Sequence, residues 1–217
     1  MNVFVVGGSG KVARSLARML SQGDHAVRSL HRKLEQAREL AALGAMAVQG
    51  DLTALSIDAL ATLMAGSDAV VFSAGAGGAG MEVTNAIDGR GLELAVAAAR
   101  QAGIRRFLLI SAFPDALRGG ERNPGFENYA RVKKLADAHL VASDLDWVIL
   151  RPGTLTDEPG TGRVRAAAAI PYGAVPRDDV AATLAAIIER PNVSRTIIEL
   201  TSGDTPIDEA LARISQR

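Results

Sequence analysis

Cysteine is absent from this chain of 217 residues, and aromatic residues make up only 4% of it. Without cysteine the chain has no disulfides, no metal sites built from thiolates and no cysteine nucleophile. Its three histidines, His25, His31 and His139, lie far apart in the sequence and form no ligand spacing. The sequence therefore predicts no metal site.

A net charge is also missing, because 24 Lys and Arg residues balance 24 Asp and Glu residues. No overall field therefore draws the chain toward nucleic acid or an anionic membrane surface. The sequence shows no signal peptide and no apolar run long enough to span a bilayer. We expect a cytoplasmic protein that binds neither nucleic acid nor membrane.

Hydrophobic residues are plentiful, at 48%, and their pattern alternates between strand-like runs and helical periodicity. No linker divides the chain. This alternation predicts one α/β domain over residues 1–217, with helices on both faces of a doubly wound, mostly parallel sheet. The predicted strands are 3–6, 25–30, 45–49, 68–72, 105–110, 147–150 and 196–200. Residues from about 152 to 217 are expected to include a small substrate-side segment.

The first predicted strand runs directly into a glycine cluster, Gly7-Gly8-Ser9-Gly10, and a helical pattern follows. Such a turn aims backbone N–H groups and the positive end of a helix dipole at one point, which binds phosphate well. Gly7 and Gly10 would let the backbone approach a pyrophosphate, and Ala13 would keep the helix close to the strand. An ordinary turn between strand and helix also uses glycine, but this position favours nucleotide binding.

The second predicted strand leads into Arg32, roughly twenty residues after the glycine turn, and no acidic residue follows until Glu35. In dinucleotide folds an acidic residue here accepts hydrogen bonds from a ribose 2′-hydroxyl, whereas Arg accommodates a 2′-phosphate. A guanidinium can grip that phosphate with two hydrogen bonds. Arg32 could also be the solvated start of the next helix, yet beside the glycine turn it favours NADP over NAD.

Two further strand ends carry candidate cofactor contacts. Asp51 follows the third strand and would lie on the ligand edge of the sheet, or would cap the next short segment. Residues 73–80 leave the fourth strand with four glycines in eight positions. Their position predicts backbone close to the cofactor, although a flexible linker has the same composition.

Tyr129 and Lys133 stand four residues apart in a predicted helix over 129–143, so their side chains share a face. The lysine cation is expected to lower the pKa of the tyrosine, which could then exchange a proton with a carbonyl oxygen. Ser111, at the end of the fifth strand, could hold the same oxygen or simply end the strand. With two tyrosines and four lysines, a chance Tyr-x-x-x-Lys match has a probability of roughly 4%, so a packing tyrosine and a solvated lysine are disfavoured.

Together these features resemble the short-chain dehydrogenase/reductase superfamily, in particular its atypical NAD(P)H-binding branch, related to NmrA-like proteins and biliverdin/flavin reductases. The resemblance covers nearly the whole chain and implies a Rossmann fold. The stretches that carry it are Gly7 to Ala13, Arg32, Gly50-Asp51-Leu52, Ser111, Tyr129 with Lys133, and Leu150 to Thr156.

The resemblance also implies roles for individual residues. Asp51 and Leu52 would lie by the adenine, residues 73–75 would line the cleft, and residues 152–155 would border the nicotinamide. Lys133 would also bind the nicotinamide ribose. The predicted catalytic residues are Ser111, Tyr129 and Lys133. The predicted cofactor contacts are Gly7, Ser9, Gly10, Lys11, Val12, Arg32, Asp51, Leu52, Ser73, Ala74, Gly75, Ser111, Lys133, Pro152, Gly153, Thr154 and Leu155.

These residues predict an NADPH-dependent reductase of a small carbonyl, quinone or flavin-like acceptor. A redox sensor that binds NADP(H) and signals through a protein partner is the rival hypothesis, and an epimerase with retained cofactor is a third. The substrate would be held by residues 114–128, predicted as a loop, and by residues 156–174, which show no clear periodicity.

Overall fold

Strands and helices alternate along most of the chain, as the sequence predicts, but between residues 146 and 176 strands follow one another without a helix. A computed structural model describes residues 1–113 and 123–215. The strands are β1 (Asn2–Val6), β2 (Ala26–His31), β3 (Met46–Gln49), β4 (Ala69–Phe72), β5 (Arg106–Ile110), β6 (Asp146–Pro152), β7 (Thr154–Thr156), β8 (Arg163–Ala167), β9 (Ala174–Pro176), β10 (Thr196–Ser202) and β11 (Thr205–Pro206). The α-helices are α1 (Lys11–Gln22), α2 (Gln36–Ala42), α3 (Ile57–Met64), α4 (Met81–Thr84), α5 (Gly91–Gln101), α6 (Pro124–Val141), α7 (Arg177–Ile188) and α8 (Ile207–Ile214), and η1 (Asn85–Arg90) is a π-helix.

Nine of the strands form one sheet in the order β11-β8-β10-β6-β5-β4-β1-β2-β3. The strands from β3 to β10 in this order pair in parallel, while β8 runs antiparallel to β10 and β11. The strand order reverses between β1 and β4. In doubly wound sheets a ligand-binding crevice forms outside the strand ends at this reversal.

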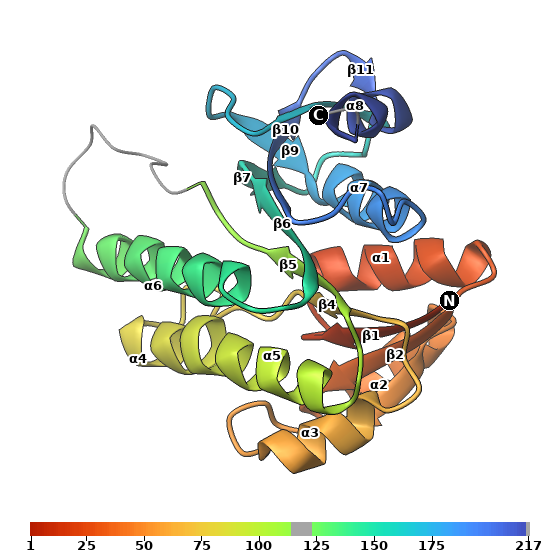
Figure 1. Ribbon diagram of the computed structural model, residues 1–217, viewed down its shortest axis with the longest axis vertical. Coiled ribbons are helices and arrows are strands. Elements are labelled where there is room, and N and C mark those ends of the chain that lie inside the picture. The colour runs from red at the N-terminus through yellow and green to blue at the C-terminus, as the bar shows by residue number, and fades with distance from the viewer. Residues whose placement is uncertain (114–122, 216–217) are drawn as a thin grey trace.

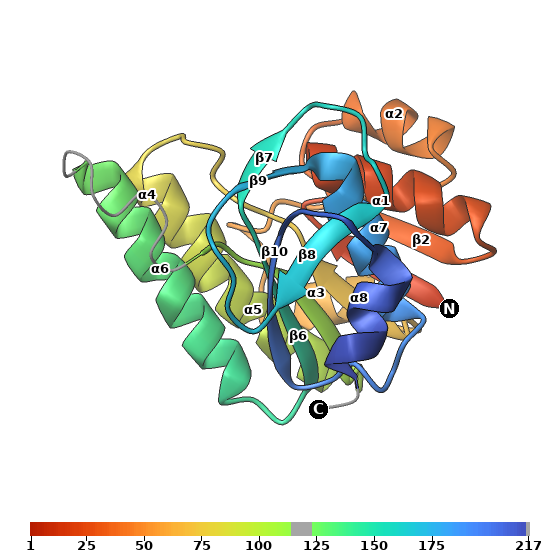
Figure 2. The same cartoon turned by 90° about the horizontal axis from the view of Figure 1, so that it is seen from above.

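Helices cover both faces of the sheet. Figures 1 and 2 show α1 and α7 side by side on one face and α5 and α6 on the other. Residues of β1 alternate between the two cores: Val3 and Val5 pack with α1 and α7, while Phe4 and Val6 pack with α3, α5 and α6. Because both faces are buried, the central strands are almost wholly apolar, which made them readable in the sequence. The predicted Rossmann-type α/β class is confirmed.

The start of α6 differs from the prediction. Residues 114–128 were predicted as a loop; 114–122 lie outside the described residues, but α6 already begins at Pro124. The Asn123 side chain accepts hydrogen bonds from the N–H groups of Gly125 and Phe126, and proline suits the first helical position. An N-cap followed by proline was therefore the signal for a helix start.

Residues 156–174 also contain structure that their sequence did not indicate. They include the antiparallel strand β8, and the segments that flank them form β7 and β9, a separate two-stranded sheet. These strands are three to five residues long, too short for a clear periodicity. Within 1–113 and 123–215, no helix has both the length and the apolar character needed to cross a bilayer.

Candidate active site

Two adjoining cavities open at the carboxyl ends of the central strands. One, the glycine-turn cavity, has a volume of about 360 Å³ and runs from the turn after β1 to the end of β2. The other, the tyrosine cavity, has a volume of about 380 Å³ and lies between the ends of β5 and β6 and the α6 helix. Ser73, Ala74 and Gly75 line both cavities, so the two form one continuous cleft.

Most of the predicted site residues line this cleft. In the glycine-turn cavity these are Gly7, Ser9, Gly10, Arg32, Asp51, Leu52, Ser73, Ala74 and Gly75. In the tyrosine cavity they are Ser73, Ala74, Gly75, Ser111, Tyr129, Lys133, Pro152, Gly153 and Leu155. Lys11, Val12 and Thr154 are outside both linings: Lys11 forms an ion pair with Asp157, Val12 is buried in the core, and Thr154 bonds to Tyr172.

The glycines of the turn have different roles. Gly7 has a φ of +79°, and a Cβ there would lie 2.5 Å from the Ala74 backbone; a Cβ on Gly8 would meet the Ser29 side chain at 2.5 Å. The fold itself therefore requires both residues. At Gly10 a Cβ would meet no atom closer than the Gly7 carbonyl oxygen, at 3.4 Å. Gly10 thus leaves space in the cavity that the protein does not fill.

The first turn of α1 is open to an anion. Its N-cap residue, Gly10, provides no side-chain cap, and the turn contains no acidic residue. The first N–H groups of an α-helix have no partner within the helix, and the helix dipole adds partial positive charge at this end. Val12 and Ala13 are buried in the core, and the N-cap residue Gly10 is the part of this helix end that lines the cavity.

At the far end of the glycine-turn cavity, Arg32 and Asp51 lie on neighbouring strand ends. Asp51 accepts hydrogen bonds from the N–H and hydroxyl groups of Thr53, at 2.9 and 2.7 Å. These bonds, and to a lesser extent the Arg32 charge, lower the pKa of Asp51. Asp51 therefore lines the cavity and also caps a turn, which combines the two alternatives that its sequence position left open. The exposed residue Arg32 lines the same cavity.

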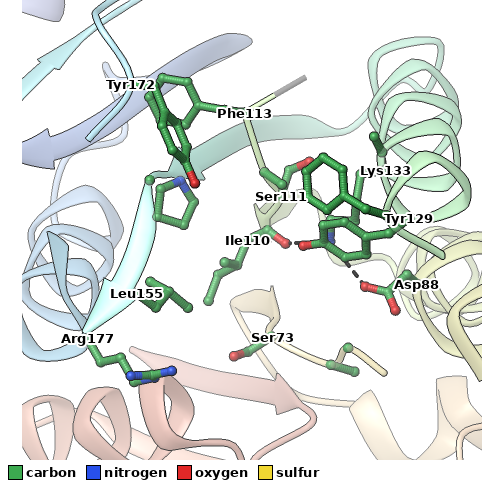
Figure 3. A pocket seen from close by; sticks show the side chains of 17 residues that line it. Ser73, Asp88, Ile110, Ser111, Phe113, Tyr129, Lys133, Leu155, Tyr172 and Arg177 are labelled. Carbon is green, nitrogen blue, oxygen red and sulfur yellow. Dashed lines mark hydrogen bonds and ion pairs between the residues drawn. The ribbon is translucent and has the colours of Figure 1, made fainter. Parts of the chain in front are cut away.

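In the tyrosine cavity, a buried ion pair holds the lysine of the Tyr-x-x-x-Lys motif (Figure 3). Lys133 Nζ donates to the Ile110 carbonyl oxygen at 2.9 Å and lies 3.5 Å from an Asp88 carboxylate oxygen. The other carboxylate oxygen of Asp88 accepts the Ala76 N–H at 2.9 Å. Asp88 thereby links the motif helix α6 to the segment that follows β4.

The pKa of Tyr129 contradicts the prediction from the motif. The sequence predicted that Lys133 would lower it, whereas the structure raises it to about 12. Burial is the main cause, and the negative charges of Asp88 and Asp137 add to it. The Lys133 cation, which lies 3.5 Å from the Asp88 carboxylate, is not among the main influences on this pKa. Tyr129 therefore holds its proton throughout the neutral range.

Ser111 lies beside a second buried carboxylate. Asp137 forms an ion pair with Arg151 at 2.8 Å, and burial raises the Asp137 pKa despite the opposing effects of Ser111 and Arg151. The Ser111 hydroxyl is buried and has no partner of hydrogen-bond geometry in the described part of the chain. It nevertheless lies close enough to Asp137 to lower the pKa of that carboxyl group.

Comparison with known proteins identifies the family of this chain. The sequence profile described as NAD(P)H-binding matches residues 7–191. The chain belongs to this family. The predicted dinucleotide-binding family is therefore confirmed, and with it the class of cofactor, a nicotinamide dinucleotide.

Named relatives of this NAD(P)H-binding protein include both epimerases and oxidoreductases. A Bacillus subtilis protein named as an uncharacterized sugar epimerase is 40% identical over 99% of this chain and 100% of its own. A Bacillus halodurans structure, provisionally named as an NAD-dependent epimerase/dehydratase, has a TM-score of 0.89 and 33% identity over 100% of both chains. A Lactococcus lactis oxidoreductase structure has a TM-score of 0.86 and 28% identity over 100% of this chain and 98% of its own.

The described residues fit a dinucleotide. Gly10 leaves room against the uncapped end of α1, where a pyrophosphate would sit, and the cleft continues from there in two directions. One direction ends at Arg32 and Asp51, and the other at Tyr129 and Lys133. The two ends therefore suit the adenosine and nicotinamide halves of NAD(P)H.

Sequence reasoning missed several residues of the tyrosine cavity, and aromatic side chains stand out among them. The chain has only eight aromatic residues: five Phe, two Tyr and one Trp. Half of these line this one cavity: Phe113, Phe126, Tyr129 and Tyr172. The other four are buried in the core. The Phe113 and Tyr172 rings meet edge to face with centroids 5.3 Å apart, and those of Phe126 and Tyr129 are 6.2 Å apart.

Two charged residues of the cavity, Asp88 and Arg177, were also missed. Asp88 is 45 positions from its partner Lys133, and Arg177 begins α7 and forms an ion pair with Asp157 at 2.7 Å. Neither belongs to a short motif. The scarcity of aromatic residues was visible in the sequence, but not their convergence from three separate segments.

Proposed function

We propose that this protein is an NADPH-dependent reductase of a small, planar acceptor: an aromatic carbonyl compound, a quinone or a flavin-like ring. The observation that carries the proposal is the tyrosine cavity itself. It joins the glycine-turn cavity directly, contains the Ser111, Tyr129 and Lys133 side chains, and is lined by four aromatic rings. Aromatic rings favour flat ligands through stacked and edge-to-face contacts.

The cofactor would be held chiefly by backbone groups of the glycine turn and by the edges of the cleft. The N-terminal end of α1 would bind the pyrophosphate, Arg32 the 2′-phosphate, and Asp51 with Leu52 the adenine side. Lys133 would reach the nicotinamide ribose. Bound in this way, NADPH supplies the hydride for the reduction.

The chain's own contribution to chemistry would be a proton. With a pKa of about 12, only about one Tyr129 side chain in 10⁵ is ionised at pH 7. Tyr129 is therefore a donor, able to protonate the strongly basic oxygen that forms as a carbonyl is reduced. Ser111 would donate a hydrogen bond to the same oxygen and hold it in place.

The names of two relatives favour an epimerase as the alternative function. The protonated state of Tyr129 helps to distinguish the two functions. Epimerisation through a transient oxidation begins with removal of a proton from an alcohol, so it needs the phenolate. Burial and two nearby carboxylates disfavour the phenolate in the described structure. Reduction is thus the direction that this site supports better.

NADPH consumption across a panel of acceptors tests the proposal. We expect quinones, flavins and aromatic aldehydes to be reduced and small aliphatic aldehydes to react much more slowly. Nucleotide sugars, followed by NMR for epimerised product, test the alternative. Tight NADPH binding without turnover of any acceptor would instead favour a redox sensor that acts through a protein partner.

The preference for NADPH over NADH depends on Arg32. Arg32→Asp should weaken NADPH binding by about 2 kcal/mol, because a charge-assisted contact becomes a repulsion. It should not weaken NADH binding, because an acidic residue here can accept hydrogen bonds from the free 2′-hydroxyl. Calorimetric titration of both cofactors measures this. Arg213→Asp on α8, which changes the net charge equally but lies outside both cavities, is the matched control. Equal wild-type affinity for NADH and NADPH would contradict the assignment.

A further inference from the structure

We propose that Asp88 is a positioning residue that fixes Lys133 and cancels its charge, so that Tyr129 acts as a proton donor and not as a base. This inference rests on the proposed function, in which Tyr129 protonates the acceptor. It assigns a role to a residue outside the Ser111, Tyr129 and Lys133 set. It also accounts for the direction of the proposed reaction.

The contacts of Asp88 show how firmly it is held. Its side chain is 2% exposed, and its two carboxylate oxygens bind different partners, the Ala76 N–H at 2.9 Å and Lys133 Nζ at 3.5 Å. A Cβ on Gly75 would lie 3.3 Å from the same carboxylate, a tight contact that leaves little room for a side chain beside Asp88. Asp88 therefore joins the wall of the cofactor cleft to the motif helix.

The backbone around Asp88 is also specialised. Asp88 lies in η1, a π-helix of six residues between α4 and α5 that packs against α6. Single π-helical turns interrupt regular helices and are frequent at functional sites. Gly89 follows directly, and a Cβ there would lie 3.4 Å from Val132, on the helix that carries Lys133. This close approach of η1 to α6 lets a short aspartate side chain reach the lysine.

Asp88 also affects the balance of charge around Tyr129. The titratable and charged groups of the described residues around Tyr129 come from several elements. They are Asp88 of η1, Lys133 and Asp137 of α6, Arg151 of β6, Tyr172 before β9 and Arg177 of α7. Asp137 is paired with Arg151, and Arg177 with Asp157. Asp88 is thus the carboxylate that balances Lys133, and without it the lysine would present an uncompensated cation one helical turn from the phenol.

The chain allows this to be measured without a substrate, because it has only two tyrosines. In a Tyr172→Phe background, the near-ultraviolet absorbance of tyrosinate reports Tyr129 alone, and a further Tyr129→Phe change should abolish the signal. The titration is read only at pH values where circular dichroism shows an intact fold. Asp88→Asn should then lower the pH midpoint of Tyr129 ionisation by one unit or more relative to the Tyr172→Phe parent. The reason is that Lys133 would no longer have a carboxylate to balance its charge.

Two further variants separate this role from a merely structural one. Asp88→Glu retains the charge and should leave the midpoint near that of the parent. Lys133→Met, which keeps Asp88 but removes its cation, should not lower the midpoint. This second variant keeps the test decisive if Asp88→Asn fails to fold, since a midpoint lowered by Lys133→Met would overturn the proposal. An unchanged or raised midpoint in folded Asp88→Asn would overturn it as well.

The same variants separate this inference from the proposed function. Where an acceptor is reduced, the alkaline limb of the pH–rate profile should move to lower pH in Asp88→Asn together with the tyrosinate midpoint. If no acceptor reacts but the midpoint still shifts, the role of Asp88 in setting the state of Tyr129 stands and the reductase assignment falls.

Discussion

Replacing Tyr129 with Phe is expected to slow NADPH-dependent reduction of a carbonyl acceptor by a factor of about 10²–10⁴, the usual contribution of a general acid. The change removes one hydroxyl and keeps the aromatic ring, whose centroid lies 6.2 Å from that of the Phe126 ring. Affinity for NADPH should barely change, because the phenol serves the acceptor and not the cofactor. The loss should therefore appear in kcat at saturating NADPH.

Tyr172→Phe provides the matched control. It removes the chain's other phenol, which lines the same cavity but is hydrogen-bonded to Thr154 at 2.7 Å, so we expect a loss below about tenfold. A Tyr129→Phe variant as fast as the wild type would show that the tyrosine supplies no proton. Water would then protonate the product, as is feasible for a reduced quinone or flavin.

The fold could be predicted because its central strands carry their signal locally. The Val3–Val6 run and the apolar residues of β4 are buried on both faces, so each reads as an uninterrupted hydrophobic stretch. The glycine turn was equally clear, since a strand precedes it and a helix follows. The start of α6 was misread because its N-cap and proline, Asn123 and Pro124, stand in a polar, glycine-bearing stretch that resembles a loop.

The site was only partly predictable, for a different physical reason. Spacing places Tyr129 and Lys133 on one helical face, but the pKa of a buried phenol depends on desolvation and on charges brought near by the tertiary fold. Asp88 lies 45 residues from Lys133 in sequence, in a π-helical turn that no short motif indicates. Tyr129 and Lys133 therefore line one cavity, as their shared helical face suggested, but the motif gave the wrong direction for the pKa shift of Tyr129.

The second large effect is expected from a substitution in the glycine turn, at Gly10. Gly10→Val should abolish measurable NADPH binding, a loss on the order of 100-fold or more, while the protein stays folded. Gly10 has φ −66° and ψ 153°, an extended conformation that valine adopts readily, so the backbone need not change. The new side chain would extend into the space beside the first N–H groups of α1, where the pyrophosphate is expected.

Gly7→Ala is the contrasting variant, because it should damage the fold directly. Its φ of +79° disfavours a side chain, and its Cβ would lie 2.5 Å from the Ala74 backbone, so the melting temperature should fall by several degrees. Circular dichroism should show native helix content and a nearly unchanged melting temperature for Gly10→Val. Calorimetric titration should show no NADPH binding to that folded variant. Wild-type affinity in folded Gly10→Val would instead place the pyrophosphate away from this turn, because no phosphate could share the volume that valine fills.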